Sequence, residues 1–268
     1  MKNILKKFIP PIILDYRALI GSYFCYAKNY KKIVRNKKFL DINKGRDLLI
    51  IGNGPSLNKV DLQKLKHLDM FACNDFYLHD DFNELNIKYY FNLDPREIWF
   101  RNMSKNIKKE KLEKINFFFS LSHKNRIDEY GEFIKNKNYI IDNGKSYYSY
   151  SNFLQIDRPT LHILNILQIL LITGNYMGYK NIYLVGFDYS FLAYRNKSQV
   201  EHFHKGNNQA FKSKEEENQY GRMACSVCTV FNALNHIKRA VISSIYNLSY
   251  EDSFLDIFES LDVKEIYK

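Results

Sequence analysis

The sequence LLIIGNGPSL, Leu48–Leu57, joins four consecutive aliphatic residues to a turn built from Gly, Asn, Gly and Pro. A short apolar run bounded by glycine is typical of a parallel strand that is buried on both faces. Gly52 and Gly54 can adopt positive φ, so we expect their backbone N–H groups to be free to approach a phosphate or a sugar. The stretch therefore predicts a buried strand that leads into a nucleotide-binding turn at the carboxyl edge of an α/β sheet.

This turn departs from two common phosphate-binding motifs. It lacks the third glycine of the dinucleotide-binding motif, and no Gly-Lys-Ser/Thr follows it. An ordinary tight turn between a strand and a helix is therefore the alternative. Pro55 fixes its own φ, and we expect Ser56 or Asn58 to cap a short helix over residues 60–65.

Length and composition indicate a globular protein with a large core. The chain has 268 residues, of which 46% are hydrophobic and 16% aromatic, which fits one α/β domain with additions or two small domains. The four cysteines do not form a disulfide framework at this length, which favours a reducing compartment. Cys225 and Cys228 lack a second pair of ligands, so we interpret them as thiols on a helix rather than as a zinc site.

Positive charge is concentrated at the N-terminus. The net charge is +11, and residues 1–46 contain twelve Lys or Arg against two Asp, a net charge of +10. Because the rest of the chain is almost neutral, a nucleic-acid-binding fold is not favoured. A basic segment ahead of a neutral domain instead predicts a tether to an anionic surface.

Residues 1–46, the N-terminal arm, also contain bulky apolar side chains. Asp15 and Arg17 interrupt the longest apolar run, so no stretch reaches the roughly 20 uncharged residues that span a bilayer. The pattern does not fit a signal peptide either. We predict a basic, amphipathic helical arm that lies in the interface of an anionic membrane. The alternative is a helical arm packed on its own domain or on a partner subunit.

Three predicted strands end in short polar side chains. Asn53 follows the first strand, and candidate strands over residues 68–77 and 88–95 contain Asn74 and Asn92 near their ends. Because the carboxyl ends of parallel strands meet at the same edge of a sheet, these side chains are expected to form one site.

The rest of the chain continues the α/β pattern. We expect helices over residues 96–116, 160–173 and 224–245, and strands over residues 116–120, 181–189 and 245–248. Residues 122–157 and 190–222 lack periodicity, and we interpret them as irregular insertions that act as a lid or face an acceptor. Residues 47–268 are thus predicted to form one catalytic domain.

Three motifs, Ile51–Leu57, Cys73–Tyr77 and Gly178–Asp188, resemble those of the bacterial sialyltransferases of glycosyltransferase family 42. They resemble equally the related superfamily of motility-accessory-factor and 6-hydroxymethylpterin-diphosphokinase-like proteins. The resemblance covers about residues 47–205, with a weaker echo over residues 247–258, and leaves the arm outside. It implies a Rossmann-like, mostly parallel α/β sheet, a variant of the GT-A-like sialyltransferase fold.

The resemblance also implies an inverting, metal-independent transferase that needs no cofactor and takes a CMP-activated nonulosonic sugar as its donor substrate. Donor and nucleotide contacts are implied for the residues that follow the strands: Gly52, Asn53, Gly54, Pro55, Ser56, Asn74, Asp75, Asn92, Asp94, Gly186 and Asp188. Tyr189 and Tyr194 are expected to donate hydroxyl groups to the departing phosphate. Arg158 and Thr160 resemble the motif before the family's long helix.

For Asp94 and Trp99, the residues themselves allow a structural role as well as a role in binding. Asp94 either binds a ribose or sugar hydroxyl group or caps the helix that follows it. Trp99, the only tryptophan, is expected to pack in the core rather than to form a platform for a sugar.

Deprotonation of an acceptor hydroxyl group needs a general base, and histidine suits that task near neutral pH. In the family the base lies in the loop after the Gly-x-Asp strand, where this chain has His202 and His204. We therefore predict that one of them is the catalytic base. The alternatives are an ordinary surface role, or a metal site for which a third ligand is not obvious.

Together these features predict a bacterial transferase of a sialic-acid-like sugar that acts in surface-polysaccharide synthesis, such as that of capsule or lipooligosaccharide. It is expected in the cytoplasm, on the inner face of the membrane, where it would act on a glycan or lipid-linked acceptor. Whether it forms a homo-oligomer is an open question at this point. One rival is pterin pyrophosphoryl transfer, for which Asp75, Asp94 and Asp188 would hold Mg²⁺. Another is a non-catalytic accessory protein that binds a nucleotide.

Overall fold

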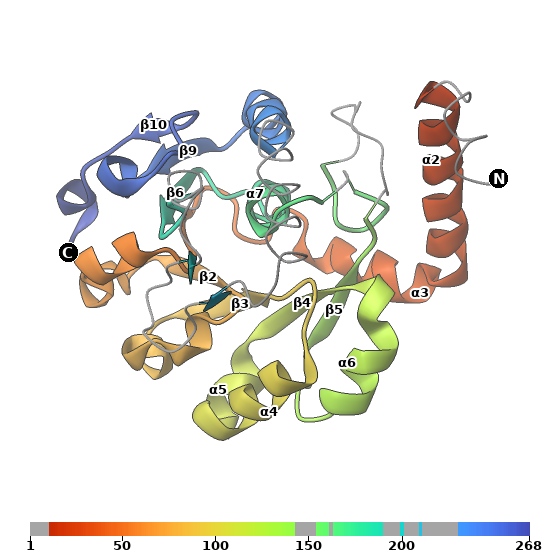
Figure 1. Ribbon diagram of the computed structural model, residues 1–268, viewed down its shortest axis with the longest axis horizontal. Helices are drawn as coiled ribbons and strands as arrows, with labels where there is room; N and C mark the ends of the chain where they lie inside the picture. The colour runs from red at the N-terminus through yellow and green to blue at the C-terminus, as the bar shows by residue number, and fades with distance from the viewer. Residues whose placement is uncertain (1–10, 143–153, 161–162, 190–198, 201–208, 211–229) are drawn as a thin grey trace.

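The computed structural model describes residues 11–142, 154–160, 163–189, 199–200, 209–210 and 230–268. At its centre lies an eight-stranded parallel sheet in the order β10-β9-β6-β1-β2-β3-β4-β5 (Figure 1). Its strands are β1 (Asp47–Ile51), β2 (Asp69–Cys73), β3 (Ile87–Phe91), β4 (Asn116–Ser120), β5 (Lys137–Ile140), β6 (Asn181–Val185), β9 (Ser244–Asn247) and β10 (Glu259–Ser260). Strands β7 (Gln199–Val200) and β8 (Gln209–Ala210) form a separate antiparallel pair. The Rossmann-like α/β fold is confirmed.

Helices precede the sheet and connect its strands. The α-helices are α2 (Pro11–Lys28), α3 (Tyr30–Ile33), α4 (Glu97–Asn106), α5 (Lys109–Lys114), α6 (Lys124–Tyr130) and α7 (Ile166–Tyr176), and residues 230–240 are also helical. The 3₁₀ helices are η2 (Val34–Phe39), η3 (Pro55–Lys59), η4 (Leu62–Leu65), η5 (Phe76–Leu78), η6 (Asp80–Asn83), η7 (Leu121–His123), η10 (Tyr250–Asp252) and η11 (Val263–Ile266).

Alternate residues of the central strands pack into two hydrophobic layers. Leu49 and Ile51 of β1 face the layer that contains residues of α4, α5 and α6. Leu48 and Ile50 face the opposite layer, with α7 and the helix over residues 230–240. Both faces of the sheet are therefore covered, which explains why β1 is a continuous apolar run rather than an alternating one.

Several strands end earlier than the sequence predicts because the backbone changes conformation. Asn74 has φ 51°, which ends β2 at Cys73, whereas the prediction extended the strand to residue 77. Gly186 has φ 72°, so β6 ends at Val185 instead of residue 189. β3 likewise ends at Phe91 and not at residue 95. Hydrophobic content marks the strands but not the points where φ becomes positive.

The predicted helix over residues 160–173 begins and ends later in the structure. Asn165 caps α7 by accepting a hydrogen bond from the Leu167 N–H at 2.7 Å, and the Gln168 side chain completes a capping box. Gly174 does not end the helix, which continues to Tyr176. Glycine instead allows close packing there, since a methyl group would lie only 3.0 Å from core side chains of β1 and β6. At the other predicted helix, residues 241–243 are not helical and β9 already begins at Ser244.

Three further local predictions are wrong. Residues 96–116 form two helices, because Ile107 and Lys108 are extended. Residues 122–157 are not wholly irregular, since they contain α6 and the edge strand β5. The turn after β1 contains 3₁₀ helices, and the cap before η4 is Asp61, which accepts a hydrogen bond from the Gln63 N–H at 3.1 Å.

The second half of the N-terminal arm belongs to the folded core. Ile33 and Asn36 are fully buried, and the Asn36 amide donates hydrogen bonds to the carbonyl groups of Tyr139 at 2.8 Å and Ile156 at 2.7 Å. The packed domain therefore starts before residue 47. Helix α2 instead stands at the side of the molecule (Figure 1). Within the described residues, no helix is both long and apolar enough to cross a membrane.

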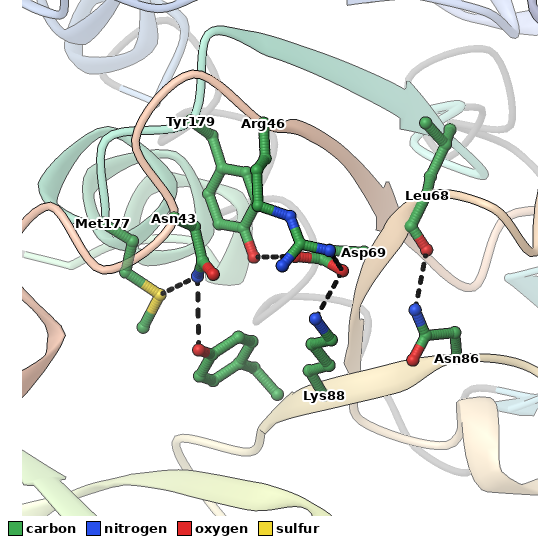
Figure 2. Close-up of polar contacts among 9 residues, drawn as sticks. Asn43, Arg46, Leu68, Asp69, Asn86, Lys88, Met177 and Tyr179 are labelled. Carbon is green, nitrogen blue, oxygen red and sulfur yellow. Dashed lines mark hydrogen bonds and ion pairs between the residues drawn. The ribbon is translucent and has the colours of Figure 1, made fainter.

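A buried carboxylate joins the arm to the amino edge of the sheet (Figure 2). The Asp69 side chain is completely buried, and its Oδ1 atom lies 2.8 Å from Arg46 Nη2 and 2.7 Å from Lys88 Nζ. The Tyr179 hydroxyl group donates a hydrogen bond to Oδ2 at 3.0 Å. Two cations and a hydroxyl group thus compensate the carboxylate for its lost hydration, and they connect β2 to the arm, β3 and the α7–β6 connection.

We expect Asp69→Asn to lower the free energy of unfolding by about 2–3 kcal/mol, measured by urea denaturation. Removing one partner of a fully buried ion pair costs about 3–5 kcal/mol. The expected loss is smaller because Arg46 and Lys88 are 52% and 33% exposed and regain part of their hydration. Asp256→Asn, at an exposed position, is the matched control. Equal stability of the two variants would contradict this role of Asp69.

Candidate functional site

The order of the strands places a change of direction next to β1. The chain proceeds outward from β1 through β2, β3, β4 and β5, and then continues with β6 on the other side of β1. In open α/β sheets, ligands bind at the carboxyl edge beside such a switch point. The strand register brings Asn53, Asn74, Asn92 and Gly186 to this edge, which confirms that the polar strand ends share one side of the sheet.

The two glycines after β1 contact β6 rather than a free space. The Gly52 N–H donates to the Val185 carbonyl group at 2.8 Å, and the Gly54 N–H donates to the Gly186 carbonyl group at 2.7 Å. The prediction that these two N–H groups are free for a ligand is therefore wrong. A Cβ atom on Gly52 would lie 2.2 Å from the Gly186 carbonyl oxygen, so glycine is required for the close approach of the two loops.

Asp188 is buried under the same turn and is only 2% exposed. Its Oδ2 atom accepts a hydrogen bond from the Ser56 N–H at 2.8 Å, and its Oδ1 atom accepts one from the Ser56 hydroxyl group. Burial raises the pKa of Asp188, while the hydrogen bonds from Ser56 oppose this shift. A Cβ atom on Gly54 would lie 2.5 Å from the Asp188 carboxyl carbon. Ser56 and Asp188 thus bond to each other beneath the turn that follows β1.

Amide side chains line the part of the edge that lies toward β2. Asn53 donates through Nδ2 to the Cys73 carbonyl group at 3.3 Å, and its buried Oδ1 atom has no hydrogen-bond partner among the described residues. Asn74 and Asp75 are half-buried, and within the described part of the chain their side chains have no hydrogen-bond partner either. These groups retain hydrogen-bonding capacity for a ligand.

Two aromatic side chains hold the backbone of Asn74 in its left-handed conformation. The Tyr90 hydroxyl group and the Trp99 Nε1 each donate a hydrogen bond to the Asn74 carbonyl oxygen at 2.7 Å. Trp99 is 4% exposed, so its predicted position in the core is confirmed. Sequence reasoning missed Tyr90 as a positioning residue. A strand pattern does not indicate that the hydroxyl group of this β3 residue reaches the end of the neighbouring strand β2.

At the end of β3, a carboxylate is paired with a histidine and an arginine. Asn92 is buried and accepts a hydrogen bond from the Asp94 N–H at 3.2 Å. The Asp94 carboxylate lies 3.1 Å from Arg126 Nη1 and 3.4 Å from His123 Nε2. Asp94 does not cap α4, whose N-cap is Arg96 without a side-chain hydrogen bond, so that alternative is wrong. Sequence reasoning missed His123, although its position directly after a predicted strand was a usable signal.

The structure does not bring Arg158 and Thr160 to the switch point. The Thr160 N–H donates to the Ile141 carbonyl group at 2.9 Å, beside β5, and Arg158 Nε lies 3.7 Å from Asp157. Four strands separate this position from β6, counted across β1 to β4. Tyr189 is buried with φ 50° against Phe231, and burial raises its pKa.

Several predicted residues cannot be placed. Tyr194, His202, His204 and the pair Cys225 and Cys228 lie outside the described residues. Within the described ranges, no three His, Cys, Asp or Glu side chains are grouped so that they could hold a metal ion.

A basic cavity of about 540 Å³ opens at the opposite, amino edge beside β3 and α5. Four lysines line it: Lys88, Lys108, Lys111 and Lys114. Two of them already have protein partners, since Lys88 pairs with Asp69 and Lys111 donates to the Leu85 carbonyl group at 2.8 Å. Burial lowers the pKa of Lys111 to about 8. This edge is therefore the less suitable of the two for a nucleotide.

Comparison with known proteins identifies one matching family model, described as 6-hydroxymethylpterin diphosphokinase MptE-like, over residues 24–194. It confirms the resemblance to this superfamily, and it begins inside the arm that the motifs had left outside. No curated protein sequence matches the chain.

Two solved structures are similar. The sialyltransferase CstII from Campylobacter jejuni, in complex with the substrate analogue CMP-3FNeuAc, is 20% identical with a TM-score of 0.49 over 83% of this chain and 88% of that chain. The MAf glycosyltransferase from Magnetospirillum magneticum AMB-1 is 10% identical with a TM-score of 0.46 over 88% of this chain and 38% of that chain.

The raised pKa of Asp188 predicts a specific pH dependence of stability. Because the folded state holds this proton more tightly than the unfolded chain, the contribution of Asp188 to the free energy of unfolding falls as pH rises above the ordinary value of 3.8. Asn cannot titrate and can still bond to Ser56. We therefore expect the stability of Asp188→Asn, relative to wild type, to increase between about pH 4 and about pH 7.

Urea denaturation at several pH values checks this expectation. Asp256→Asn, measured over the same range, separates the effect of Asp188 from the general loss of one negative charge. A stability difference between Asp188→Asn and wild type that stays constant with pH, or that changes in the opposite direction, would contradict the account of the buried carboxylate.

Proposed function

The chain belongs to the 6-hydroxymethylpterin diphosphokinase MptE-like family, and on that premise we propose that it is a nucleotide-sugar-dependent glycosyltransferase. The donor is a CMP-activated nonulosonic, sialic-acid-like sugar, as the three sequence motifs imply. The acceptor is a glycan or a lipid-linked glycan in bacterial surface-polysaccharide synthesis, and the transfer inverts the anomeric carbon. His202 or His204 is the base that the sequence motifs suggest.

One observation carries the choice of sugar transfer: amides with unused hydrogen-bonding capacity line the carboxyl edge, whereas two of the three carboxylates that a Mg²⁺ site would use, Asp75, Asp94 and Asp188, are already paired. Asp188 is bonded to Ser56 in a buried position, and Asp94 is bonded to Arg126. Asn53 and Asn74 can each both donate and accept hydrogen bonds. Such neutral groups suit a nucleotide. Its base, ribose and phosphate each present hydrogen-bonding atoms that uncharged side chains can bind and orient.

The position of these groups supports a nucleotide lying across β1 and β2. Asn53 follows β1 and Asn74 follows β2, and these strands are adjacent in the sheet. Tyr90 and Trp99 hold the backbone of Asn74, so the point from which its side chain extends is fixed before a ligand arrives. A fixed backbone lowers the entropy cost of binding. Asp75, the next residue, carries a carboxylate that can accept hydrogen bonds from ribose hydroxyl groups.

The second candidate is pyrophosphoryl transfer to a pterin, which the description of the family model favours. That chemistry is expected to need Mg²⁺ held by carboxylates and by phosphate oxygens. Asp75 is the carboxylate at this edge without a hydrogen-bond partner among the described residues, and a rearrangement would have to free Asp94 or Asp188 to join it. A non-catalytic nucleotide-binding accessory protein is the third reading.

Helix α2 supports a position on the cytoplasmic face of an anionic membrane. Five large apolar residues of α2 are 42% or more exposed: Ile13, Tyr16, Ile20, Tyr23 and Phe24. Their spacing places them in one stripe along the helix. Arg17 and Lys28 flank this stripe, and the arm as a whole carries a net charge of +10. Apolar burial and attraction of about 1 kcal/mol per nearby cation act together at such a surface.

The first test is a thermal-shift panel on the full chain with CMP, CDP, UDP, GDP and ATP, each with and without Mg²⁺. We expect CMP to stabilise the protein without metal, by about 2.7 kcal/mol at a hundred times its dissociation constant. Stabilisation by ATP that depends on Mg²⁺ would support pyrophosphoryl transfer instead. No stabilisation by any nucleotide would contradict both enzymatic readings.

A variant of Asn74 tests whether CMP binds at the carboxyl edge of the sheet. Asn74→Gly removes the amide, while glycine tolerates the observed φ of 51° that alanine would not. Loss of one or two hydrogen bonds predicts about five- to tenfold weaker CMP binding, measured by the same stabilisation. Asn86→Gly, at the amino edge, is the matched control and is expected to bind CMP as wild type does.

Membrane contact is tested by sedimentation of the full chain with vesicles. We expect binding to vesicles that contain phosphatidylglycerol, weaker binding to pure phosphatidylcholine, and at least a tenfold loss for the double variant Ile20→Glu and Phe24→Glu. Ile242→Glu changes a residue that is 97% exposed elsewhere, and is the control. Unchanged vesicle binding by the double variant would contradict the proposal. A wild-type dimer that the double variant dissociates would also contradict it, because the apolar stripe would then contact a second copy of the chain.

A further inference from the structure

An open cavity of about 530 Å³ lies between α2 and the carboxyl ends of β4 and β5. Its size falls within the range of small-molecule sites. One wall is the face of α2 that carries Ala18, Ser22 and Cys25, and the other contains Ser120, Ser122 and Asp142. Helical periodicity places this inner face of α2 opposite the exposed apolar stripe.

The lining of this cavity suits an uncharged, hydroxyl-rich ligand. Hydroxyl and amide groups alternate with small apolar side chains, and Ser120 and Ser122 share a hydrogen bond of 2.7 Å at its edge. Among the described residues of the lining, the one cation is Lys124, which is paired with Asp128. Asp142 accepts a hydrogen bond from the Ile163 N–H at 3.3 Å. Such a surface can hold sugar hydroxyl groups, whereas a phosphate would find little free positive charge.

The ion pair of His123 and Asp94 lies at the same carboxyl edge as this cavity, between the ends of β3 and β4. In the order of the sheet, Asn53 and Asn74 follow β1 and β2, Asp94 follows β3, and His123 follows β4. Ser122 and Lys124 line the cavity, while His123 between them approaches Asp94 and is 30% exposed. Asp94 and Arg126 are the charged groups that contact this histidine and its partner.

We propose that the cavity between α2 and the ends of β4 and β5 is the acceptor subsite for a neutral sugar, and that His123, in place of the His202 or His204 that the sequence motifs suggest, takes the proton of the acceptor hydroxyl group. This inference rests on the proposed function. The acceptor oxygen forms the new bond to the anomeric carbon of the donor sugar as the bond from that carbon to the phosphate oxygen breaks. The bonding electron pair leaves with the nucleotide, and the acceptor proton moves to His123, which later releases it to water.

Asp94 is a positioning residue in this arrangement. A carboxylate beside one ring nitrogen restrains the orientation of the imidazole. The same helix thereby serves two partners: its inner face lines the acceptor subsite and its outer face contacts the membrane surface. A sugar carried on a lipid could then reach His123 without leaving the bilayer.

Occupation of the cavity can be measured without any donor, because Cys25 lies in its lining. We expect at least one of galactose, glucose, N-acetylgalactosamine and N-acetylglucosamine to slow alkylation of Cys25 by N-ethylmaleimide threefold or more in the full chain, followed by peptide mass spectrometry. Ala18→Trp fills the cavity and is expected to abolish this protection. Ile20→Trp, on the opposite face of α2, should retain it. Absence of protection by all four sugars, or equal protection in Ala18→Trp, would overturn the subsite.

Transfer from CMP-N-acetylneuraminic acid to the protecting sugar tests His123. We expect His123→Gln to lower kcat about a hundredfold or more, with CMP stabilisation and Cys25 protection unchanged. Added imidazole should restore part of the activity of His123→Gly, which a merely structural role would not allow, and His236→Gln should match wild type. Unchanged kcat in His123→Gln, or no transfer to a sugar that protects Cys25, would overturn the assignment. Loss of CMP stabilisation in the wild type would instead contradict the proposed function.

Discussion

The close contact between the loops after β1 and β6 is the constraint on which the rest of the structure depends. The N–H groups of Gly52 and Gly54 bond to carbonyl groups of the β6 segment, and Asp188 is buried under Ser56. This contact joins the two halves of the sheet at the point where the strand order reverses. It also uses the backbone N–H groups of Gly52 and Gly54, so the proposed function assigns ligand recognition to the side chains that follow β1, β2 and β3.

Much of the fold was predictable because it depends on local pattern. The apolar run of β1 and the polar ends of the next strands identify a parallel sheet and its functional edge. The boundaries were not predictable, since they depend on single conformations such as the positive φ of Asn74 and the capping box at Asn165. The arm was misjudged for another reason. Asn36 is a polar residue in a basic segment, and only the tertiary structure reveals its bonds to two distant carbonyl groups.

The candidate site was predictable as an edge but not as a set of contacts. Composition and spacing indicate that Asn53, Asn74 and Asn92 meet, and the strand register places them together. They cannot indicate that Ser56 is bonded to Asp188, which lies 132 residues later in the chain. His123 was missed for the same reason, because its partner Asp94 lies on a neighbouring strand end. Resemblance to a family directed attention to histidines in a loop that lies outside the described residues.

The most direct test of the central claim, a nucleotide site at the carboxyl edge, is hydrogen–deuterium exchange of the full chain with and without saturating CMP. The account predicts slower exchange in peptides that cover residues 52–57 and 74–78, the loops after β1 and β2 at the carboxyl edge. Peptides over residues 84–88 and 108–114, at the lysine-lined cavity of the amino edge, should be unchanged. Protection confined to the amino edge would contradict the account.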